Sequence, residues 1–201
     1  YKHFISEGYN VFAFDLRNSG KSEGNSSTLG SLEKYDVLAA IRYVKQQGAK
    51  KVVLAGFSTG ASASLLAVAE DPSIAGIIAD SPFLSLDSYI DSHIEKTGLT
   101  RIPFKATLAF VLDKVGSIRE ENINIKNNIS RLTPGNILFI HSNSDDLLPL
   151  EDNKPFYEEF AKKNTGITEL YETSAKGHAN SYSEDMDEYL ERINTFLNKI
   201  Q

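Results

Sequence analysis

Short runs of apolar residues alternate with amphipathic segments along most of this chain. The apolar runs predict buried strands at Tyr9–Phe14, Val52–Ala55, Ile74–Ala79 and Asn136–His141, with a less regular strand at Gly166–Thr173. Helical spacing predicts helices over Leu32–Gln47, Lys154–Lys163 and Glu184–Ile200. A further helix is predicted directly after the second strand, and Tyr1–Glu7 is predicted to be the end of another helix. Strands that are apolar on both faces and alternate with helices predict a parallel sheet covered on both sides.

One long segment interrupts this alternation. About 50 residues, 84–132, separate the third and fourth predicted strands, far more than an ordinary connection needs. We therefore divide the chain into a core, residues 1–83 and 133–201, and an inserted helical cap, residues 84–132. Two interpretations stay open: the insertion packs for stability alone, or it roofs an active site and lines an apolar pocket.

The second strand runs directly into Gly56-Phe57-Ser58-Thr59-Gly60, and small, helix-compatible residues follow. A strand, a sharp turn with serine at its apex and a helix are the context in which G-x-S-x-G presents a nucleophile. We expect Gly56 and Gly60 to let the strand and the helix approach without side-chain clashes. An ordinary glycine-rich turn is the alternative, but the context favours Ser58 as a nucleophile.

A serine nucleophile needs a base, and the base needs a carboxylate that orients it. In open α/β sheets such groups lie at the carboxyl ends of strands. Asp145 and Asp146 follow the fourth predicted strand, and His178 follows the fifth. The resulting order of serine, aspartate and histidine is the order of hydrolases with a strand–turn–helix nucleophile. His141, just before the two aspartates, is interpreted as a structural hydrogen-bonding residue.

Four separated segments together resemble the α/β-hydrolase superfamily, in its esterase, thioesterase and serine-peptidase branches. They are G-Y-N-V-F-A-F-D-L-R-N-S-G-K-S-E-G, G-F-S-T-G-A, I-L-F-I-H-S-N-S-D-D-L-L-P and K-G-H. In that order they resemble a strand with its loop, the nucleophile turn, the acid strand and the catalytic histidine turn. The resemblance implies the α/β-hydrolase fold, with Ser58 as nucleophile and His178 as base.

The resemblance also chooses among the carboxylates. In the family pattern the acid lies four residues after a histidine and four before a proline, and His141 and Pro149 make that residue Asp145. Asp146 is the fallback. Asp80, after the third predicted strand, is a less favoured alternative that some relatives use.

An oxyanion hole follows from the same resemblance. One donor is the backbone N–H of Thr59, the residue after the nucleophile. The family's second donor comes from a turn after a further strand, which lies between the strands predicted at 9–14 and 52–55. We expect residues upstream of Tyr1, or another segment or partner, to supply that strand, because buried backbone groups left unpaired cost about 1–3 kcal/mol each.

Composition narrows the possible functions. The 201 residues are 41% hydrophobic and 24% charged, with a net charge of -6 and no cysteine. The acidic balance argues against a nucleic-acid or anionic-membrane partner, and no apolar run is long enough to cross a bilayer. The lack of cysteine excludes a disulfide, a thiolate metal site and a cysteine nucleophile. We expect a cytoplasmic protein without metal or cofactor, and the oligomeric state stays open.

The predicted function is hydrolysis of a small-molecule carboxylic ester, with a thioester or a peptide as the runner-up substrate. Pocket residues for an acyl or aryl group are predicted at Phe57, Phe83, Phe104 and Phe110. A non-catalytic binding protein on the same fold is a rival, since fold alone does not assign function. A nucleotide-binding protein is disfavoured because the turn carries neither G-x-G-x-x-G nor a P-loop lysine.

Overall fold

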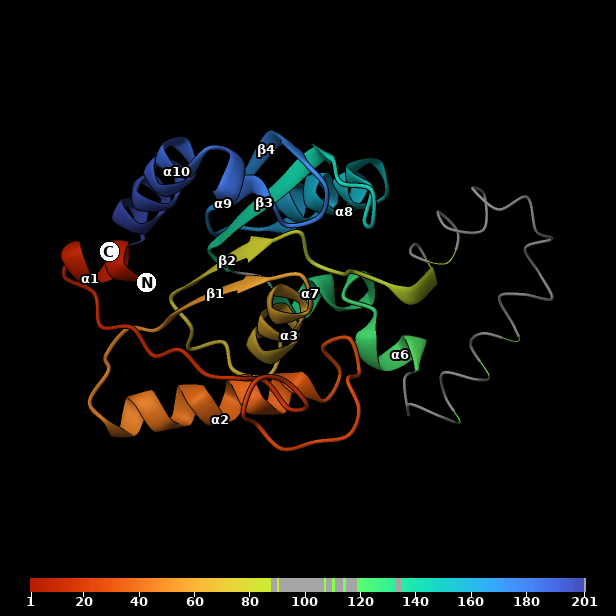
Figure 1. Ribbon diagram of the computed structural model, residues 1–201, viewed down its shortest axis with the longest axis horizontal. Helices are drawn as coiled ribbons and strands as arrows, with labels where there is room; N and C mark the ends of the chain where they lie inside the picture. The colour runs from red at the N-terminus through yellow and green to blue at the C-terminus, as the bar shows by residue number, and fades with distance from the viewer. Residues whose placement is uncertain are drawn as a thin grey trace.

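A parallel sheet forms the centre of the molecule. The computed structural model describes residues 1–87, 90, 107, 110, 114, 119–132 and 135–200. Within these residues, four strands pair in the order β1-β2-β3-β4, all parallel (Figure 1). They are β1 Val53–Phe57, β2 Gly76–Asp80, β3 Ile137–Ser144 and β4 Thr168–Lys176. The parallel sheet predicted from the apolar runs is confirmed.

The helices of the described residues largely follow the predicted positions. They are α1 Lys2–Ser6, α2 Glu33–Gln46, α3 Thr59–Val68, α6 Glu120–Ile123, α7 Ile129–Leu132, α8 Leu150–Lys163, α9 Ser181–Glu184 and α10 Met186–Lys199, with a short 3-10 helix η1 at Lys126–Asn128. Helix α8 begins at Leu150 rather than Lys154, because Leu150 is buried and the acidic residues that follow it suit a helix N-terminus. Helix α10 begins after Asp185, whose side chain accepts the Glu188 N–H and caps the helix.

Alternating residues of β2 and β3 point to opposite faces of the sheet, as the two-residue period of a strand requires. On one face, Ile77 and Phe139 lie in a core cluster with apolar residues of α3 and α8. On the other face, Ile78 and Leu138 lie in a second cluster with α10, which Phe4 of α1 joins. Helix α2 covers the outside of α3 (Figure 1). The predicted two-sided cover is therefore present.

The strand predicted at Tyr9–Phe14 is wrong for this structure. The segment forms no strand, and Val11, Phe12 and Phe14 are 41–48% exposed, with the Phe12 ring packed against Tyr43 of α2. A strand exists only where its backbone groups meet a partner, and β1 pairs with β2 alone among the described strands. The expectation that a further strand lies between this segment and β1 stays a prediction.

The described ends of the insertion attach to the core. Phe83, Leu86, Ile90 and Ile123 are buried in one cluster with Leu148. The backbone N–H of Ile125 donates to the Leu84 carbonyl, which joins the two ends of the segment. Whether residues 84–132 form a roof stays a prediction.

Among the described residues, no helix combines the length and apolarity needed to span a bilayer.

Strand β1 and helix α3 are in close backbone contact at Gly56. A Cβ atom built on Gly56 would lie 2.5 Å from the backbone carbonyl carbon of Gly60, whereas a Cβ on Gly60 would meet nothing within 4 Å. The expected close approach therefore depends on Gly56. The second glycine contributes its backbone to the contact but leaves room for a side chain.

We expect these two glycines to respond oppositely to alanine. Gly56→Ala forces the strand and the helix apart and is expected to reduce the free energy of unfolding by about 3 kcal/mol or more. Gly60→Ala adds a methyl group in open space at a helical position and is expected to stabilise by up to about 1 kcal/mol. Urea unfolding followed by circular dichroism measures both. Equal destabilisation by the two substitutions would contradict this assignment of the contact.

Candidate active site

Ser58 lies between β1 and α3 in a strained backbone conformation. Its φ of 49° and ψ of -118° are unusual for a residue with a side chain, and such outliers persist only where the surroundings hold them. Its N–H donates to the Asp80 carbonyl at the end of β2 over 2.8 Å, and its carbonyl accepts the Ser62 N–H over 3.0 Å. The sheet and the first turn of α3 thus fix the predicted nucleophile from both sides.

Asp145 and His178 are joined directly. Asp145 follows β3, and its Oδ2 lies 2.8 Å from Nδ1 of His178, which follows β4. The Asp145 side chain is fully buried, and that of His178 is 17% exposed. The N–H of Gly177 donates to the Ser144 carbonyl over 3.1 Å, which ties the histidine turn to the end of β3. Because a carboxylate only accepts, Nδ1 of His178 carries the proton.

Backbone N–H groups of the turn after β3 donate hydrogen bonds to the buried Asp145 carboxylate. Asp145 Oδ1 accepts the N–H of Leu147 over 3.0 Å and that of Leu148 over 2.8 Å. Burial alone would raise the pKa of Asp145, but the interactions with His141 and His178 and the Leu148 N–H outweigh it and hold that pKa well below its usual value. Asp145 is therefore an anion at neutral pH.

The other ring nitrogen of His178, Nε2, is the atom that a role as base would require. This Nε2 atom is buried and has no hydrogen-bond partner within the part of the chain that the structure describes, so no hydrogen bond joins it to Ser58 Oγ. Catalytic hydrogen bonds are often long in substrate-free sites and tighten when substrate binds. Ser58, Asp145 and His178 all follow strands of one parallel sheet, so they lie along the same edge.

Asp80 is buried at this edge too, but it contacts other groups. Its carboxylate accepts from the Ser81 hydroxyl over 2.9 Å and from the Tyr189 hydroxyl over 3.0 Å. Burial raises the pKa of Asp80, and the two hydroxyl hydrogen bonds offset this only in part. The Tyr189 ring, in turn, stacks on Phe57 with ring centres 6.5 Å apart. Asp80 therefore holds Tyr189 of α10 near Ser58, while the hydrogen bond to His178 comes from Asp145.

The remaining predicted site residues fall in different places. Thr59 is the first residue of α3, directly after Ser58, and Asp146 is exposed. Phe57 is 48% exposed beside Ser58, Phe110 is 63% exposed and Phe83 is buried at 5% in the core. Phe104 lies outside the described residues. Of the four predicted pocket residues, Phe57 lies beside Ser58, which it directly precedes in the sequence.

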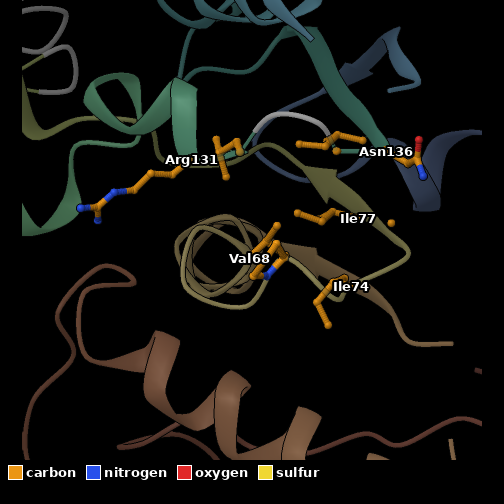
Figure 2. A pocket seen from close by; sticks show the side chains of 10 residues that line it. Val68, Ile74, Ile77, Arg131 and Asn136 are labelled. Carbon is orange, nitrogen blue, oxygen red and sulfur yellow. The ribbon is translucent and has the colours of Figure 1, made fainter. Parts of the chain in front are cut away.

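A cavity of about 130 Å³ lies elsewhere. Figure 2 shows Val68, Ile74 and Ile77 around it, with the Arg131 side chain turned away. Gly76, Ile77, Asn136 and Ile137 place it at the amino ends of β2 and β3, opposite to the edge that carries Ser58. This cavity is not part of the candidate site.

Comparison with known proteins identifies the family of the chain. The profile of the family described as serine aminopeptidase, S33, matches residues 1–122, more than half of the chain. The chain belongs to this family of α/β hydrolases. The α/β-hydrolase fold predicted from the four sequence segments is thereby confirmed.

Relatives of this S33-family chain include enzymes and proteins known by a gene label alone. It is 28% identical over 206 residues to YqkD of Bacillus subtilis, covering 100% of this chain and 66% of YqkD. It is 28% identical to the lysophosphatidylserine lipase ABHD12 of Danio rerio, covering 79% of this chain and 41% of the lipase. Among solved structures, the Pyrococcus furiosus esterase Pf2001 superimposes with a TM-score of 0.76 and 28% identity, covering 98% of this chain and 74% of the esterase. The chain thus spans between two fifths and two thirds of these two curated relatives.

Tyr157 and Tyr189 are site-adjacent residues that the sequence analysis missed. Both lie on the buried faces of amphipathic helices, where their rings count as core residues. Their hydroxyls nevertheless bind His141 and Asp80, respectively. The signal available in sequence was the choice of tyrosine over phenylalanine at a buried position, since a buried hydroxyl requires a partner.

The low pKa of Asp145 predicts a pH dependence of stability. A carboxylate whose pKa is depressed in the folded state stabilises that state above its unfolded pKa of about 3.9, and this contribution is lost as pH falls through the folded pKa. The loss of unfolding free energy in Asp145→Asn is therefore expected to be largest above about pH 4 and to shrink below it. Chemical unfolding followed by circular dichroism at several pH values tests this. Asp146→Asn, at an exposed position, is the control, and a pH-independent difference for Asp145→Asn would contradict the assignment.

Proposed function

We propose that the protein is a serine hydrolase that cleaves carboxylic esters through an acyl-enzyme on Ser58. The observation that carries this proposal is the hydrogen bond of 2.8 Å between Asp145 Oδ2 and His178 Nδ1, with Nε2 of the same ring left without a partner among the described residues. That arrangement leaves a correctly protonated base at the sheet edge where Ser58 is held in its strained turn. A purely structural histidine would be expected to use both ring nitrogens, as His141 does.

The proposed mechanism has two steps. Ser58 Oγ attacks the ester carbonyl carbon while His178 Nε2 accepts its proton, and Asp145 stabilises the imidazolium that forms. His178 then gives this proton to the leaving alkoxide oxygen, and water repeats the sequence to release the acid. The Thr59 N–H is the proposed donor to the oxyanion, and the loss of one such donor costs about 10²–10³ in rate.

Two relatives favour an ester over a peptide as substrate. The Pyrococcus furiosus protein is an esterase and the Danio rerio protein is a lipase, whereas the family carries an aminopeptidase description. Ester cleavage also asks less of the general acid, because an alkoxide leaves more readily than an amide anion. A peptidase on the same site is the second candidate, and it rests on the family description.

Substitution of Ser58 is the direct test. In the intact protein, Ser58→Ala is expected to lower kcat for p-nitrophenyl butyrate by about 10⁴-fold or more, because the nucleophile is lost. A fluorophosphonate probe is expected to modify Ser58, as read by peptide mass spectrometry, and Ser183→Ala is the matched control at an exposed serine. Retained turnover in Ser58→Ala would overturn the assignment of Ser58 as the nucleophile. No labelling and no turnover in the intact protein would instead support a binding protein on a hydrolase fold.

Substrate class has its own test. We expect the intact protein to show a higher kcat/KM for p-nitrophenyl butyrate than for alanine p-nitroanilide. Initial rates measured over the same pH range compare the two substrates, with Ser58→Ala as the background. A higher kcat/KM for the anilide would replace the esterase assignment with the peptidase one.

A further inference from the structure

A second histidine, His141 of β3, lies on the inner side of the candidate acid. Its side chain is fully buried, and both ring nitrogens have partners. Nε2 lies 2.7 Å from the Leu148 carbonyl oxygen and 3.5 Å from Asp145 Oδ2. Nδ1 lies 2.8 Å from the hydroxyl of Tyr157 in α8. One buried carboxylate thus lies between two imidazole rings.

Hydrogen-bond chemistry assigns a protonation form to each ring. A carbonyl oxygen only accepts, so Nε2 of His141 carries a proton, and in the neutral ring Nδ1 accepts from the Tyr157 hydroxyl. His178 needs the opposite form, with the proton on Nδ1 and Nε2 open. The two rings therefore carry their protons on different nitrogens. The Tyr157 hydroxyl, by donating to Nδ1 of His141, favours the tautomer in which Nε2 of His141 donates to the Leu148 carbonyl.

Leu148 links His141 to the acid. Its N–H donates to Asp145 Oδ1 over 2.8 Å, and its carbonyl accepts from His141 over 2.7 Å. Movement of the His141 ring would therefore displace the same peptide segment that holds the carboxylate. The titratable groups that face His141 are Asp145 from the turn, Tyr157 from α8 and, at longer range, Asp80 from β2.

We propose that His141 and Tyr157 form a positioning pair that fixes Asp145 in the orientation required by His178, which rests on the hydrolase function proposed above. An apolar side chain of similar size would fill this site without the desolvation that a buried imidazole and a buried hydroxyl require. The polar pair fixes the orientation of the Leu148 carbonyl through the His141 hydrogen bond, and thereby the position of the Leu148 N–H that donates to Asp145. Among the described residues, the hydrogen bonds of His141 go to Tyr157 and Leu148 and not to Ser58.

Three variants of the intact protein test the pair. Tyr157→Phe removes the hydroxyl that selects the His141 form, and we expect kcat/KM for p-nitrophenyl butyrate to fall about tenfold, the value of one buried hydrogen bond. His141→Leu removes the donor and is expected to cost more. His141→Gln keeps an N–H near the Leu148 carbonyl and is expected to stay within about threefold of the parent. His3→Leu, which removes a hydrogen-bonding histidine from α1, is the matched control.

The pH profile separates positioning from packing. When Asp145 is misplaced, protonated His178 loses its anionic partner, so the acid limb of kcat/KM is expected to move to lower pH in Tyr157→Phe and His141→Leu but not in His3→Leu. Circular dichroism checks that each variant is folded. Folded Tyr157→Phe with the parent rate and an unmoved acid limb would overturn the proposal.

A spectroscopic readout keeps this test independent of turnover. In ¹⁵N-labelled protein, His178 is expected to show a proton on Nδ1 at low field, assigned by its loss in His178→Gln, and His141 a proton on Nε2. Tyr157→Phe is expected to shift or broaden the His178 Nδ1 proton signal. An unchanged signal overturns the positioning role, whereas full turnover in Ser58→Ala overturns the proposed acyl-enzyme on Ser58, so the two failures are distinguishable.

Discussion

The hydrogen bond between Asp145 and His178 is the interaction on which the candidate site depends. It joins turns that follow adjacent strands, β3 and β4, and it exists because a buried carboxylate is tolerated between them. Such a group is costly unless its lone pairs meet donors. Here two backbone N–H groups serve one oxygen and His178 serves the other, with His141 close by. The hydrogen-bond donors of the turn after β3 are thus arranged around the negative charge of Asp145.

Asp145 and Asp80 are two buried carboxylates at neighbouring strand ends, and their pKa values are shifted in opposite directions. Asp145 meets N–H donors and imidazole rings, and its pKa is lowered in spite of burial. Asp80 meets hydroxyls, and burial raises its pKa. A group that must stabilise an imidazolium has to be ionised near neutral pH, so Asp145 suits that role. Asp80 instead holds the Tyr189 hydroxyl and, through its own carbonyl, the N–H of Ser58.

Sequence could predict the sheet and the set of candidate groups because both follow from local pattern. Apolar runs marked β1 to β4, and the resemblance to the family's acid motif, matched at His141 and Pro149, favoured Asp145 over its neighbour Asp146. Strand pairing depends on residues far apart in the sequence, so the apolar run at Tyr9–Phe14 indicated a strand although the segment forms none in the structure. The separate contributions of Gly56 and Gly60 also depend on the distance between two backbones, which no spacing reveals.

The acid turn also shows why core tyrosines escape prediction. On α8, Phe156, Tyr157 and Phe160 lie in one core cluster, and the Tyr157 ring stacks on Phe139 of β3 with centres 4.4 Å apart. The ring therefore packs as a phenylalanine would, while its hydroxyl extends one bond further to His141. Packing fixes the ring in place, and that fixed ring gives the hydroxyl a defined position. An apolar core and a polar site are thus supported by the same side chain, so the precision of the acid turn derives from the close packing beneath it.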